Sequence, residues 1–314
     1  MKYTFFNKKR ISLLLCAWAV FTIAGCSIHE DLDPCKYYQL VVKVVNPSGE
    51  DITGAGDVQH VSLYIFDENK KFLEKKEVAG DAIKNRQPIE LDYLADRDLE
   101  VVAFGNETNQ EVPELQPGDA IEELYVKVKE QNGYAVFPDK IYNGLKAVST
   151  KAAGDGDVFM HEVVIQEKIS YVQAQTLGLA NYLKKHQTKA SVNPEDYSFY
   201  VNRTPNTLNY QGEPTGEQIV YDPDAGTVVE SGELSTAENN VLPAEGFTVD
   251  LNLPTGEKIT VEEAEDEDGV VKPLSVAAGK RKLVLFLFDD EGTYIGARMS
   301  VRDWGSGDDQ QIIF

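Results

Sequence analysis

Cysteine and histidine are scarce in this 314-residue chain, and their scarcity excludes several kinds of site. The three cysteines, Cys16, Cys26 and Cys35, are too few for a disulfide scaffold or a cysteine-rich zinc module. Only four histidines occur, and no two of them lie three to five residues apart, so the helical His-x-x-x-His metal pattern is absent. We therefore expect no metal site built from these residues.

Positive charge is also in short supply. The chain has 30 Lys and Arg against 52 Asp and Glu, which gives a formal net charge of -22. An acidic excess of this size repels a phosphate backbone, so we expect no nucleic-acid partner. It equally argues against adhesion to an anionic membrane through basic patches.

Local catalytic motifs are missing as well. The sequence contains neither Gly-x-Ser-x-Gly nor Ser-x-x-Lys. A Gly-x-Gly at Gly54 and Gly56 lacks the third glycine of a dinucleotide-binding loop, because Gln59 occupies that position. His60 and His161 lie in strand-like segments and are interpreted as packed or solvent-facing strand residues. We predict that the protein is not an enzyme and binds no cofactor.

One acidic segment is dense enough to consider for cation binding. Residues 262–269 hold six acids in eight positions, and clustered carboxylates can bind Ca²⁺. Ala264 interrupts the ligand spacing of an EF-hand, so a solvated loop is the favoured interpretation. The sequence leaves open whether this loop binds a cation.

The N-terminal segment has the layout of a lipoprotein signal peptide. Basic residues at positions 8–10 precede an apolar stretch, residues 11–25, which is shorter than the about 20 residues that a transmembrane helix needs. The stretch leads into an Ile-Ala-Gly-Cys sequence that ends at Cys26 and resembles a lipobox. We expect residues 1–25 to be removed and Cys26 to be lipidated, with residues 26–36 as an acidic tether.

The acidic run after Cys26 has two interpretations, which the sequence leaves open: a surface-export signal, or simply a solvated tether. Because Cys16 leaves with the signal peptide and Cys26 is acylated, Cys35 would be the only free thiol. The mature monomer could then form no internal disulfide.

Beyond residue 37, short apolar runs recur between turn signals without a long helical period, which predicts an all-β fold. We expect a first strand at residues 40–45 and alternating strands at 61–66 and 295–301. Residues 283–288 are apolar on both faces, which favours a central, covered strand.

Two features bear on the organisation of the chain. Residues 149–157 are small, polar and glycine-rich, and are the best linker candidate between an N-terminal unit, 37–150, and a C-terminal unit, 157–314. Residues 63–73 and 285–295 share the order strand, acidic turn, strand, which predicts two similar hairpins rather than a tandem duplication.

Three segments together resemble a known family. The tether ends in Asp-Pro-Cys at residues 33–35, a Leu-Tyr-Ile-Phe-Asp strand follows at 63–67, and Met-Ser-Val-Arg-Asp-Trp stands at 299–304. This resembles the anchor lipoproteins of Bacteroidales fimbriae, the FimB-like and minor-fimbrium anchor group of the fimbrillin superfamily, over nearly the whole mature chain.

The resemblance implies two transthyretin-like β-sandwich domains in tandem and a surface-exposed, lipid-anchored location in the outer membrane. It implies fimbrial subunits as partners, held by β-strand pairing, and membrane attachment through the lipid on Cys26. The implied role is to anchor a fimbria and to terminate its assembly, without catalysis.

Stalk subunits of the same superfamily lose their first strand to an Arg-specific protease. No arginine lies between Arg10 and Arg86, which favours an anchor that keeps this strand. Lys36 and Lys43 leave open a cut by a lysine-specific protease.

Other interpretations stay open beside the anchor. Residues 310–314 are either a last edge strand, which is slightly favoured, or a strand donated to a neighbour. One alternative function is a stalk or tip subunit. Another is a glycan-binding lipoprotein of a polysaccharide-uptake system, although Trp304 is the only tryptophan of the mature chain and such binders need exposed tryptophans.

Overall fold

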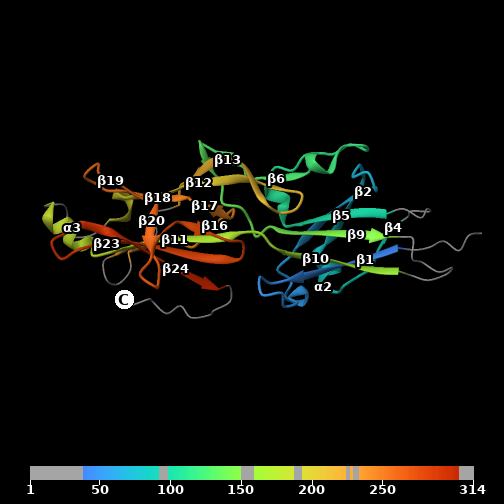
Figure 1. Ribbon diagram of the computed structural model, residues 1–314, viewed down its shortest axis with the longest axis horizontal. Coiled ribbons are helices and arrows are strands. Elements are labelled where there is room, and N and C mark those ends of the chain that lie inside the picture. The colour runs from blue at the N-terminus through green and yellow to red at the C-terminus, as the bar shows by residue number, and fades with distance from the viewer. Residues whose placement is uncertain are drawn as a thin grey trace, which may run out of the picture.

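The computed structural model describes residues 38–91, 98–149, 159–186, 193–223, 227–228 and 233–303. Figure 1 shows an elongated arrangement of β-sheets in which the early strands gather at one end and the late strands at the other. The helices are short: α2 (Gly80–Lys84), α3 (Leu179–Lys185) and the 3-10 turns η1 (Thr53–Ala55), η2 (Glu107–Asn109), η3 (Ile121–Glu123) and η4 (Pro194–Asp196). The all-β prediction is confirmed.

The first sheet has seven strands in the spatial order β3-β2-β5-β9-β10-β1-β4. Their bounds are β1 (Tyr38–Val45), β2 (His60–Phe66), β3 (Phe72–Ala79), β4 (Ile89–Leu91), β5 (Asp98–Gly105), β9 (Tyr142–Ser149) and β10 (Phe159–Glu167). Side chains from β1, β2, β5, β9 and β10 share one buried cluster, and α2 lies against both β1 and β2. The two edge strands also approach each other: Lys76 Nζ of β3 donates to the carbonyl of Glu90 of β4 at 2.7 Å. The sheet therefore curls around its apolar face, on which strand alternation places these side chains.

Two sheets of eight and seven strands, called the late sheets below, and one two-stranded sheet form the rest of the described structure. One follows the order β14-β15-β11-β23-β24-β20-β21, with β16 paired to β11, and another follows β19-β18-β12-β13-β8-β7, with β6 paired to β12. The first of these contains β11 (Ser170–Leu177), β14 (Thr227–Val228), β15 (Leu234–Ser235), β16 (Asn239–Val241), β20 (Glu263–Glu265), β21 (Val271–Pro273), β23 (Lys280–Phe288) and β24 (Tyr294–Asp303). The second contains β6 (Tyr125–Lys127), β7 (Glu130–Gln131), β8 (Tyr134–Ala135), β12 (Ser198–Asn209), β13 (Pro214–Tyr221), β18 (Thr248–Asn252) and β19 (Lys258–Val261). The pair β17 (Ala244–Glu245) and β22 (Ser275–Val276) completes the set.

The strand pairing does not follow the predicted limits 37–150 and 157–314. β10 lies past the expected linker but pairs with β1 and β9 of the first sheet. β6 and β8 lie before it but pair with β12 and β13. The prediction went wrong here because a small, polar, glycine-rich segment is equally typical of a loop between two strands of one sheet. The chain passes from the first sheet to the next at residues 168–169, and residues 150–157 lie outside the described residues.

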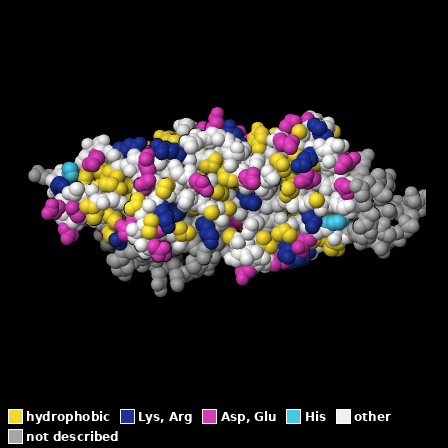
Figure 2. All heavy atoms as spheres, viewed as in Figure 1, with side chains coloured by type: hydrophobic (Ala, Val, Ile, Leu, Met, Phe, Trp, Pro, Cys, Tyr) yellow, Lys and Arg dark blue, Asp and Glu magenta, His cyan; other side chains and the backbone are white. Residues whose placement is uncertain are grey.

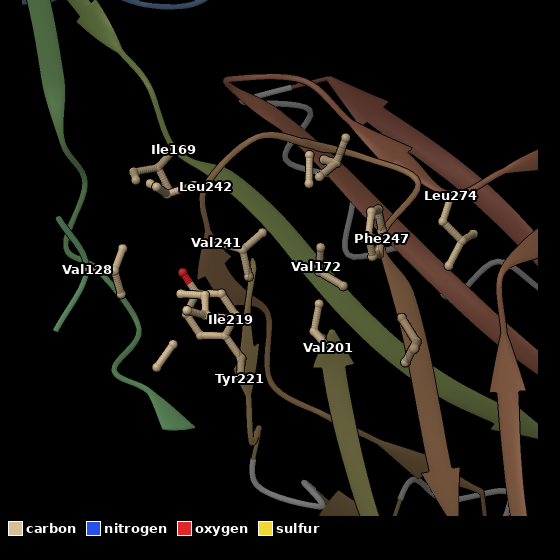
Figure 3. Packing of buried hydrophobic residues seen from close by; sticks show 14 of the residues in the cluster. Val128, Ile169, Val172, Val201, Ile219, Tyr221, Val241, Leu242, Phe247 and Leu274 are labelled. Carbon is tan, nitrogen blue, oxygen red and sulfur yellow. The ribbon is translucent and has the colours of Figure 1, made fainter. Parts of the chain in front are cut away.

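A large apolar cluster ties the early and late parts of the chain together. Val128, from the segment between β6 and β7, lies close to Ile219 and Tyr221 of β13 in Figure 3 and shares their cluster. Its backbone N–H donates to the carbonyl of Asn206 at 2.8 Å. Phe66 and Phe104, on the outward face of the first sheet, belong to the same cluster. The segment between β5 and β9 is therefore packed on both sides by apolar side chains.

The two predicted hairpins, 63–73 and 285–295, are confirmed and use the same turn. Asp67 Oδ1 accepts backbone N–H bonds from Asn69 and Lys71, both at 2.8 Å. Asp289 Oδ1 accepts the equivalent bonds from Glu291 at 3.0 Å and from Thr293 at 2.7 Å. The aspartate side chain replaces backbone partners that the turn leaves open, which explains why both turns begin with this residue.

Candidate functional site: the first strand and its neighbours

β1 is the first described element after the expected lipid tether, and it lies inside the first sheet. It runs parallel to β10 over its full length, from the pair Tyr38 and Phe159 to the pair Val45 and Gln166. On its other side, Tyr38–Leu40 pair antiparallel with β4. The predicted first strand, 40–45, is confirmed and begins two residues earlier.

The side chains of β1 explain why it stays in the sheet. Leu40, Val42 and Val44 are at most 2% exposed and point into the cluster that the sheet encloses. Val41 and Val45, on the opposite face, are also buried. Burial of five apolar side chains makes this strand part of the core rather than an appendage.

The end of β1 is held by the turn that follows it. The backbone N–H of Val44 donates to Thr53 Oγ1 at 2.9 Å, and its carbonyl accepts from the N–H of Ile52 at 2.9 Å. From the parallel neighbour, the Gln166 side chain donates to the carbonyl of Asn46 at 3.1 Å. The contacts of Val44 with Thr53 and Ile52 close the end of β1 that β4 is too short to cover, and Gln166 holds the chain on the β10 side.

Several sequence-predicted positions lie outside the described residues. These are the proposed lipid site Cys26, the free thiol Cys35, Trp304 and the terminal segment 310–314. No helix in the described parts of the chain is long and apolar enough to cross a bilayer.

The two histidines singled out in the sequence lie on different strands of the first sheet. The imidazole of His60, at the start of β2, is hydrogen-bonded to the carboxylate of Glu77, and its Nδ1 lies 3.7 Å from Oε2 of Glu107. His161 is on β10, opposite Leu40 in the register. Burial, together with the nearby Lys146, lowers the pKa of His161. Over the described ranges, no group of three or more acidic, histidine or cysteine side chains is arranged to hold a metal ion.

Glu107 is a buried acid that the sequence did not single out. It is 3% exposed, and one of its carboxylate oxygens accepts a hydrogen bond from the hydroxyl of Ser62. Burial raises the pKa of this carboxyl group above its usual range. It lies at the start of η2, two residues after the end of β5.

Residues 263–265 of the acidic segment 262–269 form β20, and residues 266–269 lie in the turn that leads to β21. Asp266 Oδ1 accepts backbone N–H bonds from Asp268 at 3.0 Å and from Val270 at 2.9 Å, and its carboxylate forms an ion pair with Lys272. These bonds lower the pKa of Asp266, the lysine contact first. The loop interpretation holds for residues 266–269, whereas residues 263–265 form a paired strand with Ala264 buried.

A hollow of about 270 Å³ lies beside this turn. Lys282 lines it, is 5% exposed, and approaches the sulfur of Met299 at 3.5 Å. Burial lowers the pKa of this lysine. On the face of the molecule seen in Figure 2, basic and acidic side chains are interspersed, so this face has no patch of a single sign.

The parallel neighbour of β1 was not anticipated. The alternation of Val163 and Ile165 on the buried face of β10 marks a strand. Nothing local shows that the strand pairs with β1 more than a hundred residues earlier, because parallel pairing leaves no turn signal in the sequence.

Comparison with known proteins shows which family shares this sequence and architecture. A family model described as "Fimbrillin-A associated anchor proteins Mfa1 and Mfa2" matches residues 31–309. The chain is 22% identical over 299 residues to the major fimbrium anchoring subunit FimB of Porphyromonas gingivalis, covering 95% of this chain and 96% of that protein.

Solved structures share the fold. The fimbrial anchor protein Mfa2 from Porphyromonas gingivalis superposes with a TM-score of 0.62 at 12% identity, covering 85% of this chain and 98% of that one. A candidate adhesin from Bacteroides ovatus gives a TM-score of 0.63 at 18% identity over 88% of this chain and 96% of the other. The family match spans nearly the whole chain, and we conclude that this protein belongs to the family of fimbrillin-A associated anchor proteins.

Proposed function

We propose that the protein is an outer-membrane lipoprotein that anchors a fimbria to the cell surface and terminates its assembly. Cys26 carries the lipid, and fimbrial subunits pair with the protein through β-strands. Membership of the anchor family supports the fimbrial role. The lipobox-like sequence that ends at Cys26 supports the lipid.

The observation that carries the proposal is the position of β1. A strand that is paired along its length with β10 and buried on both faces leaves no open groove in the first sheet at that place. A subunit cannot add its own strand there, so assembly stops at this protein. The absence of arginine between Arg10 and Arg86 supports retention of the strand, because an Arg-specific protease has no site before β2.

We also propose that the chain forms two β-sandwich domains that meet at residues 168–169. The curled first sheet, with its own enclosed cluster, supports a first unit. The two late sheets share the large apolar cluster that contains Val128 and Tyr221, which supports a second unit. The second unit includes β6, β7 and β8 from the earlier part of the chain.

The experiment is a complementation test in the organism. Deletion of the gene should release fimbriae into the medium or leave them with uncontrolled length, and the wild-type gene should restore attachment. Cys26→Ala should fail to restore it, whereas Cys35→Ala, a matched change nine residues later, should restore it fully.

The surface form gives the second readout. Mass spectrometry of the wild-type protein should find a lipidated Cys26 as its first residue. A surface form that begins near residue 50 without lipid, or a Cys26→Ala variant that still incorporates labelled fatty acid, contradicts the proposal.

A further inference from the structure

The chain enters the first sheet at the start of β1 and passes to the next sheet from the end of β10, the strand parallel to β1. The N-terminal end of β1, at Tyr38, receives the tether, and the C-terminal end of β10, at Glu167, leads within three residues into β11 of the next sheet. Because the strands are parallel, these two connections lie at opposite ends of the same ladder. Figure 1 shows the resulting order along the long axis: the entry of β1 at one end, then β1 and β10, then the late sheets.

This arrangement fixes how tension acts on the ladder. A pull on the N-terminus of β1 against the late sheets slides β1 along β10, so the hydrogen bonds across the ladder are strained together. If both connections lay at the same end of the ladder, the same pull would open one pair at a time. We infer that the β1–β10 ladder is the mechanical clamp through which tension passes from the membrane tether to the rest of the chain. This inference rests on the proposed function, with the lipid on the N-terminal tether, and it takes the fimbria to pull on the late sheets.

The side chains around the ladder reinforce it against sliding. Val42 and Val163 are paired in the register and both lie in the enclosed cluster. Any slip along the ladder moves such pairs out of their packing, and a slip of one residue would turn the buried face outward. Near the other end, the Gln166 side chain bonds the carbonyl of Asn46, just beyond β1.

The junction beyond β10 is also bonded on both sides. The backbone N–H of Lys168 donates to the carbonyl of Ile141 at 2.8 Å. The carbonyl of Ile169 accepts from the N–H of Gly279 at 2.7 Å. Ser170 Oγ donates to the carbonyl of Ala277 at 2.8 Å. Tension that leaves β10 therefore enters hydrogen-bonded structure rather than a slack linker.

Single-molecule force spectroscopy tests the clamp on the mature chain, residues 26–314, prepared without lipid and with Cys35→Ser. Cys26 is one handle. In the sliding geometry the second handle is Glu291→Cys, in the exposed turn between β23 and β24. In the peeling geometry it is Met160→Cys, which is 61% exposed and lies beside the start of β1 in the register. Both proteins contain the same ladder, so only the direction of loading differs.

We expect the rupture force to be about twofold or more higher in the sliding geometry, because eight paired residues share the load there and the terminal pair bears it alone in the peeling geometry. The first sliding event should release chain length that lies between residues 46 and 124, because the next segment, β6, stays paired with β12 in the second unit. Val42→Ala should lower that force, whereas Val249→Ala, the same change at an equally buried site on β18, should not.

Equal forces in the two geometries, or a first event that releases no chain from residues 46–124, overturn the inference. Since the measurement uses protein without lipid, its outcome does not depend on acylation of Cys26. Failure of the clamp and failure of the proposed lipid anchor are therefore separate results.

Discussion

Separating β1 from the rest of the chain should cost the protein its fold. The turn after β1 offers a site for a controlled cut, because Ser48 and Gly49 are exposed. A site for a sequence-specific protease inserted between them can be cleaved in the folded protein. The cut leaves β1 in place but removes its covalent link to the first sheet.

The size of the effect follows from the burial of the strand. β1 contributes five buried apolar side chains: Leu40, Val41, Val42, Val44 and Val45. At about 1.5–3 kcal/mol for each fully buried side chain, their contribution is about 7–15 kcal/mol. The total stability of a typical domain is about 5–15 kcal/mol, so the first sheet should not persist without this strand.

The assay has two stages. After cleavage, the two pieces should elute together from a sizing column, because the strand stays bound. After separation in denaturant, the large piece alone should fail to refold by circular dichroism, and a synthetic peptide of residues 38–46 should restore it.

A matched cut between Glu267 and Asp268, in the turn from β20 to β21, is the control. It interrupts only a short edge hairpin, so the melting temperature should change little. A large piece without β1 that folds and melts like the uncut protein would refute the reasoning.

Three further expectations follow from buried groups and close approaches. Glu107→Gln should gain stability relative to the wild type as the pH rises from 4 to 7. Burial raises the pKa of Glu107 in the folded state, so the wild-type fold loses stability as the pH rises above the usual glutamate pKa of about 4.3. Urea midpoints across this pH range measure the difference. Lys282→Met should be more stable than the wild type at pH 7, and the difference should shrink toward pH 10. Burial lowers the pKa of Lys282, so the cost of burying its charge disappears as the amine deprotonates. Equal urea midpoints of the two proteins at pH 7 would contradict this. Gly178→Ala should lower stability by at least about 1–3 kcal/mol in thermal melts, since φ is +85° and a Cβ would lie 2.2 Å from the carbonyl oxygen of Phe288, whereas Gly256→Ala, with φ +85° and open space, should lose less.

Local features of this fold could be predicted from sequence because their causes are local. The alternation at 61–66 and the acidic turn at Asp67 are set by neighbouring residues, and both were placed correctly. The doubly apolar run at 283–288 indicated a central strand, and β23 is paired on both sides, with β11 and β24. The family followed from segments that keep their order along the chain.

The features that failed depend on distant pairing. No local signal distinguishes the loop between β9 and β10 from a linker between domains, so the boundary at 150–157 was misplaced. Alternation at 295–301 predicted a half-buried strand. Met299 on the expected face is 6% exposed, but Ile295, where the register with β23 shifts, and Val301 are 62% and 50% exposed, because alternation shows neither a bulge nor how far along the strand a face is covered.

The interleaving of early and late strands also determines when this protein can fold. Val126 of β6 pairs with Leu208 of β12, and Tyr38 of β1 pairs with Phe159 of β10. While the chain is being synthesised, the later residue of each pair is still missing when the earlier one leaves the ribosome. Contacts of this kind form slowly, because a long loop must close before any of them is stabilised. A chain that enters a membrane translocation channel N-terminus first therefore stays extended until most of its length has crossed. For the exported lipoprotein that we propose, the connectivity that joins the sheets of the folded protein would thus keep the chain unfolded before export.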